Sequence, residues 1–217
     1  MTPTAQSPFP EAVIFDFDGV ILDSARMKTN AYLDLYGLRD PAMQERLRRI
    51  VWRNGGLSRV KMLPILEREL FDRATGEDGI MELARRYADI VDRRVNDCPL
   101  IAGAESLLDR LSGTPCHLVS GTPQDTLLGT VRAKGLEDRF VSVTGSPSVK
   151  AEVFAAIVAA GGHEATRTLA VGDSLTELDA ARTSGIAFIG VVPLDEPNPF
   201  PADVPTVNDL FGLAQRL

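Results

Sequence analysis

The sequence has little of several features that mark specialised classes of protein. Among its 217 residues it has 2 cysteines, 1 tryptophan and no apolar run of membrane-spanning length. No charged segment followed by an apolar stretch opens the sequence, and two thiols are too few for the disulfide framework of a small secreted protein. We therefore expect a cytoplasmic protein outside the membrane, with Cys98 and Cys116 both free.

Positive charge is also scarce. There are 23 basic and 30 acidic residues, a net charge of −7, and the basic residues form no run that could follow a phosphate backbone. We therefore expect no nucleic-acid partner. The 44% of hydrophobic residues is ample for a packed core, so we expect the chain to fold alone, as a monomer or a weak dimer. The first ten residues hold three prolines and no periodicity, and they predict a loose arm.

The rest of the chain shows two textures. From residue 24 to about 97, apolar residues recur at spacings of three and four, which is typical of amphipathic helices, with breaks at Gly37 and Pro41. From Pro99 onward, helical patterns alternate with short apolar runs that are typical of strands. These runs, with one more ahead of the helical segment, are residues 12–15, 116–120, 140–145, 168–173 and 187–192.

The strands alternate with helices and are too apolar to have a solvent-exposed face. This pattern favours a parallel sheet covered on both sides. The predicted fold class is therefore α/β, with a doubly wound, Rossmann-like parallel sheet and an inserted all-helical domain. The predicted core comprises residues 1–23 and 99–217, and the predicted helical domain comprises residues 24–98.

Polar residues follow four of the apolar runs, at the strand ends where open parallel sheets bind ligands. Asp16 and Asp18 follow the first run, and Asp173 follows another. Carboxylates brought together there would raise one another's pKa unless a cation neutralised them. All-oxygen ligation suits Mg²⁺, and Mg²⁺ in turn favours a phosphate-bearing ligand. The remaining polar strand ends are Ser120–Thr122 and Gly145–Lys150.

Four segments together resemble the motifs of the haloacid dehalogenase superfamily, in its phosphatase branch. The resemblance is to members with a helical cap between the first and second motifs, of the phosphoglycolate phosphatase and beta-phosphoglucomutase type. The order, spacing and strand-end placement of all four motifs match, and the helical segment falls where this branch carries its cap. The segments are DFDGV (16–20), SGT (120–122), Lys150 and GDSLTE (172–177).

The resemblance implies a role for each motif residue. Asp16 would be the nucleophile that forms an aspartyl-phosphate, and it needs no activating base because it is ionised at neutral pH. Asp18 would protonate the leaving alcohol and then activate the water that hydrolyses the intermediate. Lys150 would complete the catalytic group. The implied Mg²⁺ ligands are Asp16, Asp18 through its backbone carbonyl, Asp173 and Glu177.

Substrate contacts are expected from two places. The second motif would bind the phosphate through Ser120, Gly121 and Thr122. The stretch from Gly55 to Arg59 resembles a loop of some small-molecule phosphatases in the family, although an interhelical loop with a solvated arginine would also explain it. A cationic, hydroxyl-bearing lid would suit an acidic or polyhydroxylated phosphate ester. The predicted contacts from the helical segment are Lys28, Asn54, Ser58 and Arg59.

Two residues depart from the family pattern. Glu177 stands where an aspartate is usual, and Lys28 stands where sugar phosphomutases carry a histidine, which weakens the mutase interpretation. Asp18 argues against the dehalogenase and phosphonate-cleaving branches, which lack this acid. The predicted function is Mg²⁺-dependent hydrolysis of a small-molecule phosphate monoester. The alternatives are a sugar phosphomutase and an idle binding module, although an idle module would be expected to have lost Asp16, Asp18 or Lys150.

Overall fold

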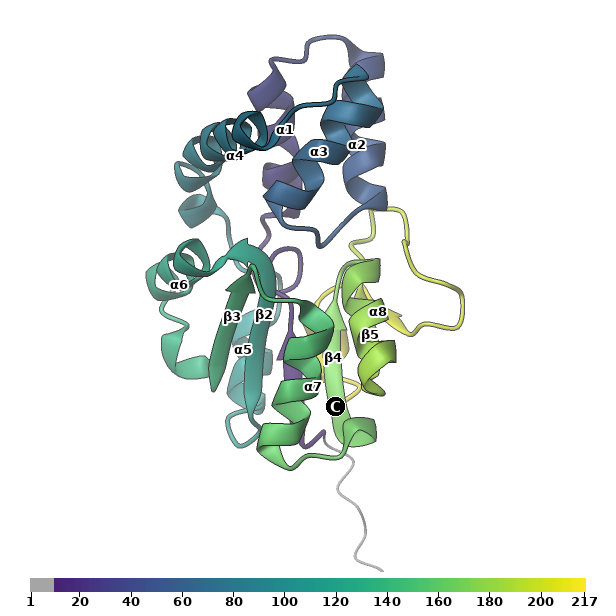
Figure 1. Ribbon diagram of the computed structural model, residues 1–217. Helices are drawn as coiled ribbons and strands as arrows, with labels where there is room; N and C mark the ends of the chain where they lie inside the picture. Colours follow the sequence, from purple (N-terminus) through teal and green to yellow (C-terminus); the bar gives the residue numbers. More distant parts are fainter. Residues whose placement is uncertain (1–9) are drawn as a thin grey trace, which may run out of the picture.

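The fold is centred on one parallel sheet, seen in a computed structural model that describes residues 10–217 (Figure 1). The arm predicted at the N-terminus lies outside the described residues except for Pro10. Six strands form the sheet in the order β3-β2-β1-β4-β5-β6, and every neighbouring pair is parallel. The strands are β1 Ala12–Phe15, β2 Cys116–Pro123, β3 Ser142–Ser146, β4 Thr168–Gly172, β5 Ala187–Val191 and β6 Thr206–Val207.

The five predicted strands and the α/β fold class are confirmed. The sequence did not reveal β6, because a pair of residues is too short to show any periodicity. In β1, which lies inside the sheet between β2 and β4, successive side chains point to opposite faces. Ile14 packs on one face with Phe154 and Ala181, while Phe15 belongs to the hydrophobic core of the other face.

Helices cover both faces, as doubly wound topology requires. In Figure 1, α7 and α8 lie in front of the sheet and α5 lies behind it. The buried residues of α6 and α9 join the same core cluster as those of α5. These helices are α5 Ala104–Arg110, α6 Gln124–Ala133, α7 Lys150–Gly161, α8 Leu175–Ser184 and α9 Leu210–Ala214. Short 3₁₀ turns occur at Val95–Asp97, Glu137–Arg139 and Ala165–Arg167.

Four helices follow β1 and lie beyond the carboxyl ends of the strands (Figure 1). Of the two predicted breaks, Gly37 follows the first helix and Pro41 is the first residue of the second. Gly37, with a left-handed φ of 61°, ends the first helix, and Asp40 caps the second by accepting a hydrogen bond from the Met43 amide at 2.8 Å. We refer to residues 24–98 as the cap; its independence as a domain stays a prediction. The helices are α1 Ala25–Tyr36, α2 Pro41–Arg53, α3 Arg59–Phe71 and α4 Glu77–Asp92.

Two further expectations can be compared with the described part of the chain. Cys98 and Cys116 are unpaired, and both are buried. Within residues 10–217, no helix combines the length and the apolar character that a bilayer crossing needs.

Candidate active site

A cleft of about 1300 Å³ lies between the cap and the carboxyl ends of the strands. On its sheet side the cleft is lined by residues of three of the four predicted motifs. On the cap side it is lined by polar and aromatic residues of α1, α3 and α4, among them Lys28, Arg59 and Tyr87. The motif residues on the sheet side are Asp16, Asp18, Gly19, Ser120, Gly121, Thr122, Asp173 and Ser174.

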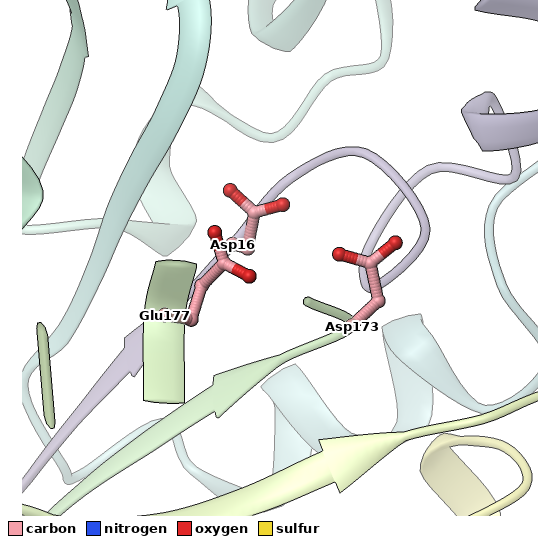
Figure 2. Close-up of side chains that lie close together, drawn as sticks. All are labelled: Asp16, Asp173 and Glu177. Atoms are coloured by element: carbon pink, nitrogen blue, oxygen red, sulfur yellow. The ribbon is translucent and has the colours of Figure 1, made fainter. Parts of the chain in front are cut away.

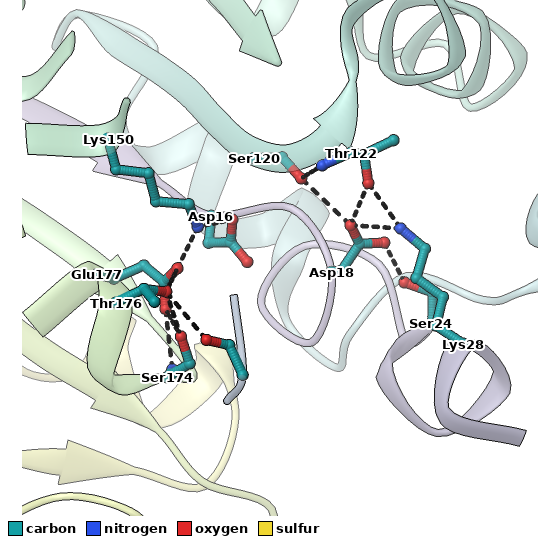
Figure 3. Close-up of polar contacts among 11 residues, drawn as sticks. Asp16, Asp18, Ser24, Lys28, Ser120, Thr122, Lys150, Ser174, Thr176 and Glu177 are labelled. Carbon is teal, nitrogen blue, oxygen red and sulfur yellow. Dashed lines mark hydrogen bonds and ion pairs between the residues drawn. The ribbon is translucent and has the colours of Figure 1, made fainter. Parts of the chain in front are cut away.

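Lys150 connects the first and fourth motifs (Figure 3). It is the first residue of α7, and its Nζ donates to Asp16 Oδ1 at 2.9 Å and forms an ion pair with Glu177 in the first turn of α8. A positive charge at a helix N-terminus is unfavourable on its own, so these two carboxylates explain its placement. The Lys150 side chain is only 10% exposed. This buried lysine is the centre of one half of the site, which comprises Asp16, Lys150 and Glu177.

The ionisation of this half is governed by burial and by mutual charge. Burial raises the pKa of Asp16 to about 7, although the Lys150 charge opposes the rise. For Lys150 itself, burial is outweighed by Asp16 and Glu177, so its pKa is raised. Burial is likewise outweighed at Glu177, where Lys150 and hydrogen bonds lower the pKa. One lysine therefore stabilises the ionised form of Glu177, but it does not supply enough positive charge to offset the effect of burial on Asp16.

A third carboxylate, Asp173, adds further negative charge that the lysine does not balance. Oxygens of Asp16, Asp173 and Glu177 all lie within 4.8 Å of one another (Figure 2). Asp173 forms no hydrogen bond or ion pair with any residue between 10 and 217, and burial raises its pKa well above the ordinary value. A divalent cation would relieve both Asp16 and Asp173, and a group of carboxylate oxygens suits a hard ion such as Mg²⁺. The donor set therefore fits the predicted metal.

Glu177 lies in this cluster, but its oxygens have other partners. Oε1 pairs with Lys150 and accepts a hydrogen bond from Thr176 Oγ1 at 2.9 Å. Oε2 accepts from the Ser174 backbone amide at 3.0 Å and from the Ser174 hydroxyl, which forms a capping box at the start of α8. Glu177 thus holds Lys150 and the helix end; its role as a metal ligand stays a prediction.

Asp18 turns away from this group of carboxylates toward the cap (Figure 3). Its Oδ1 accepts from Ser24 Oγ at 2.6 Å, and its Oδ2 accepts from Thr122 Oγ1 at 2.8 Å and Ser120 Oγ at 3.2 Å. Lys28 Nζ lies 2.6 Å from the same Oδ2. Burial opposes ionisation here, but Lys28 and the hydroxyl donors outweigh it, so the pKa of Asp18 is lowered.

Gly19 makes the approach of the first and fourth motifs possible. Its φ is 84°, a left-handed conformation that side-chain-bearing residues rarely adopt. A Cβ atom at this position would lie 2.3 Å from Asp173 Oδ2. Only glycine therefore lets the loop after β1 pass directly beside Asp173.

The structure separates the four predicted cap contacts into two groups. Lys28 and Arg59 line the cleft, and Arg59 acts electrostatically on Tyr32 and Tyr87, whose stacked rings lie 4.2 Å apart. Asn54 and Ser58 are not among the residues that line the cleft. Asn54 Nδ2 donates to the Ile50 carbonyl at 2.8 Å, and Ser58 is buried before the first turn of α3. The substrate contacts predicted for these two residues gain no support from the geometry.

Several residues of the site were not singled out in the sequence. Ser174 could have been found from the Ser-x-x-Glu spacing to Glu177, which is a capping-box pattern. Ser24 and Thr176 show no such sequence pattern, because their contacts depend on the tertiary fold and on the rotamers of neighbouring side chains. Tyr32 and Tyr87 come from helices far apart in the sequence and meet only in the packed cap.

Comparisons with known proteins agree with this architecture. A phosphoglycolate phosphatase of Xanthomonas campestris pv. campestris is 29% identical over 194 residues, which cover 85% of this chain and 84% of that protein. The crystal structure of CbbY from Rhodobacter sphaeroides in complex with phosphate superimposes with a TM-score of 0.76 at 15% identity, covering 94% and 96% of the two chains. The HAD-hydrolase YfnB of Bacillus subtilis, bound to magnesium, gives a TM-score of 0.72 at 20% identity, covering 95% and 98%.

The family itself is shown by a match that spans most of the chain. Residues 10–185, which include all four motifs and the whole cap, match the haloacid dehalogenase-like hydrolases. The predicted recognition is thereby confirmed, and the chain belongs to the haloacid dehalogenase-like hydrolase family.

Proposed function

We propose that the protein is a Mg²⁺-dependent phosphatase that hydrolyses a small-molecule phosphate monoester through an aspartyl-phosphate on Asp16. The observation that carries this proposal is the asymmetric environment of the Asp16 carboxylate. Oδ1 accepts a hydrogen bond from Lys150, whereas Oδ2 accepts none from the described residues, and Asp16 lines the cleft. One oxygen is thus held in place while the other is available to attack phosphorus.

The two chemical steps are divided between the two aspartates. In the first step, Asp16 Oδ2 forms a bond to phosphorus as the ester oxygen leaves, and protonated Asp18 gives that oxygen its proton. In the second step, ionised Asp18 takes a proton from water, whose oxygen attacks phosphorus and releases Asp16 and inorganic phosphate. The water proton restores the acid form of Asp18. The contacts of Asp18 with Lys28, Ser24 and Thr122 favour its base form, which the second step needs.

Charge stabilisation would come from groups that already surround the site. Lys150, whose Nζ lies beside Asp16 Oδ1, and the Ser120 hydroxyl, which lies beside Asp18 Oδ2, would face the oxygens of the transferred phosphoryl group. When bound, Mg²⁺ would supply positive charge to those oxygens. Asp16 and Asp173 are the side chains that fit it best, since they carry the raised pKa values of the cluster.

The substrate class follows from the cap side of the cleft. Arg59 lines the cleft and forms no ion pair with any residue that the structure describes, so its charge is available to a ligand. An ester whose remainder carries a carboxylate would meet that charge. The Xanthomonas relative is named for phosphoglycolate, an ester of this kind. We therefore extend the proposal to a small acidic phosphate ester.

The direct test is to trap the intermediate. Wild-type protein is incubated with Mg²⁺ and a panel of phosphate esters, quenched in acid and digested, and a phosphoryl adduct is expected on the peptide that contains Asp16. Asp16→Asn should show neither adduct nor turnover, whereas Asp179→Asn, at an exposed position of α8, should behave as wild type. Turnover by folded Asp16→Asn, with deamidation ruled out by mass, would refute the covalent mechanism. Measuring released inorganic phosphate also separates hydrolysis from the sugar phosphomutase alternative, which would pass the phosphoryl group to a sugar phosphate.

A further inference from the structure

The cap touches the catalytic core at a loop with two glycines, between α2 and α3. The carbonyl oxygen of Gly55 accepts a hydrogen bond from Thr176 Oγ1, in the first turn of α8, at 3.2 Å. Gly56, with φ of 76°, lies so close that a Cβ atom would be 1.7 Å from Thr176 Oγ1 and 2.7 Å from Glu177 Oε1. On the other side, a Cβ atom on Gly121 would be 2.7 Å from the Gly56 carbonyl oxygen. The loop is therefore docked tightly between the second and fourth motifs.

A continuous polar path leads from this docking contact to the nucleophile. Thr176 Oγ1 lies 2.9 Å from Glu177 Oε1, and the same Glu177 oxygen pairs with Lys150 Nζ (Figure 3). Lys150 Nζ then donates to Asp16 Oδ1 at 2.9 Å. Both Glu177 and Asp16 are at most 5% exposed, so water does not compete strongly for these contacts. The backbone of the cap and the nucleophile thus share one chain of contacts.

Within this path, the hydroxyl of Thr176 is the member that contacts both the cap and Glu177. It carries one proton, which it can donate to the Gly55 carbonyl or to Glu177 Oε1. The Ser174 hydroxyl also lies within hydrogen-bonding distance, at 2.8 Å. When the loop is docked, the hydroxyl shares its proton between the Gly55 carbonyl and Glu177. When the loop is undocked, the hydroxyl donates more strongly to Glu177. Because Glu177 Oε1 also binds Lys150, docking alters how firmly the glutamate holds the lysine.

We propose that Thr176 is a positioning residue that couples docking of the loop at residues 54–58 to the placement of Lys150 against Asp16. The inference rests on the proposed phosphatase function for the role of Lys150, and it adds the route by which the cap acts on that site. The Thr176 hydroxyl lies 2.8 Å from the Ser174 hydroxyl, but a purely structural role at the helix end would not explain its hydrogen bond to the Gly55 carbonyl, because the capping box is formed by Ser174 and Glu177.

The kinetic test uses a pair of substitutions that differ in the hydroxyl. Thr176→Val keeps the shape but removes the hydrogen bonds, and we expect kcat to fall about tenfold, the scale of one hydrogen bond, with KM nearly unchanged. Thr176→Ser restores the hydroxyl and should restore kcat. Thr183→Val is the matched control, since Thr183 lies on the same helix and, among residues 10–217, its hydroxyl bonds only the Asp179 carbonyl. Its kcat should equal that of wild type.

A second measurement reports docking without any need for turnover. The chain has 1 tryptophan, Trp52, which lines the cleft and whose carbonyl accepts a hydrogen bond from the Gly55 amide at 3.3 Å. We expect acrylamide to quench Trp52 fluorescence more strongly in Thr176→Val than in wild type, in Thr176→Ser or in Thr183→Val. Circular dichroism melts should show equal unfolding temperatures for all four proteins.

Each outcome bears on the proposal. Full kcat in Thr176→Val, an equal loss in Thr176→Ser, a loss confined to KM, or identical quenching in all four proteins would overturn the coupling role. Absence of turnover by the wild-type chain on every ester would instead refute the proposed phosphatase function. The quenching comparison would still decide whether Thr176 holds the loop, so the two failures are distinguishable.

Discussion

The Nζ atom of Lys28 lies 2.6 Å from Oδ2 of Asp18, so a residue of the cap pairs directly with one of the two aspartates of the first motif. Lys28 Nζ also donates to Thr122 Oγ1 at 2.7 Å, which ties the cap to the second motif. The second cap contact, from Gly55 to Thr176, leads to Asp16. Each proposed catalytic aspartate is therefore linked to a different part of the cap.

The first prediction concerns the pH dependence that Lys28 imposes. In wild type, Lys28 and the hydroxyl donors together outweigh burial and lower the pKa of Asp18, so the base form persists at low pH. In Lys28→Met the burial remains without the charge, and the pKa of Asp18 rises. The acidic limb of the pH profile for phosphoenzyme hydrolysis should therefore move to higher pH, by about one to three pH units, the effect of a nearby opposite charge.

The control for this prediction is Lys28→Arg, which keeps the positive charge and should leave the acidic limb near its wild-type position. Single-turnover dephosphorylation across the pH range provides the measurement. An acidic limb that stays in place in Lys28→Met would show that Lys28 does not set the ionisation of Asp18.

The second prediction concerns Asp18 as acid and base. Asp18→Ala should lower kcat for alkyl phosphates by about 10²–10⁴-fold, the usual contribution of general acid–base catalysis. With p-nitrophenyl phosphate, formation of the phosphoenzyme should lose much less, because nitrophenolate leaves without a proton. A stopped-flow burst of nitrophenolate would reveal this difference. Equal losses in the burst rate for alkyl and aryl esters would contradict the assignment of Asp18 as the acid.

The third prediction concerns the metal. A chelator should abolish turnover, Mg²⁺ should restore it, and Ca²⁺ should inhibit, because Ca²⁺ accepts about six to eight oxygens and can take both oxygens of Asp16. Asp173→Asn should raise the Mg²⁺ concentration needed for half-maximal activity, since it removes one of the two carboxylates with a raised pKa. Undiminished turnover in excess chelator would rule out a metal-dependent mechanism.

The fourth prediction concerns recognition of the ester's remainder by Arg59. Arg59→Ala should cut kcat/KM for the best acidic ester of the panel about ten- to a hundredfold, the scale of a hydrogen bond to a charged group. It should hardly change kcat/KM for a minimal aryl phosphate, which has no remainder to bind. Arg53→Ala is the matched control, because Arg53 pairs with Glu69 outside the cleft. Equal losses on both esters would assign Arg59 to the stability of the cap instead.

Local patterns were sufficient for the elements and for the strand ends. The alternation of apolar runs and helical patterns predicted the parallel sheet, and Gly37 and Pro41 marked real helix boundaries. Asp16 and Lys150 were both predicted from their positions next to elements. Chain direction alone brings such positions together, because the carboxyl ends of all parallel strands meet at one edge of the sheet.

The sequence patterns did not predict which side chains contact each other. The sequence did not show that Lys28 pairs with Asp18, or that Glu177 holds Lys150 and the start of α8. The substrate contact of Lys28 and the metal role of Glu177 stay predictions. Asn54 and Ser58 shared a loop with Arg59 in the sequence, yet only Arg59 lines the cleft. Which atoms meet depends on rotamers and on how the cap docks, and neither leaves a local pattern.

The sequence by itself thus determined the fold class, the family and the set of residues at the strand ends, since periodicity and motif order are written along the chain. Only the tertiary structure decided how those residues divide into two groups, one around Asp16 and Lys150 and one around Asp18 and Lys28. The physical reason is that a buried charge is stabilised by whichever opposite charge packing brings within a few ångströms, whatever its distance in the sequence.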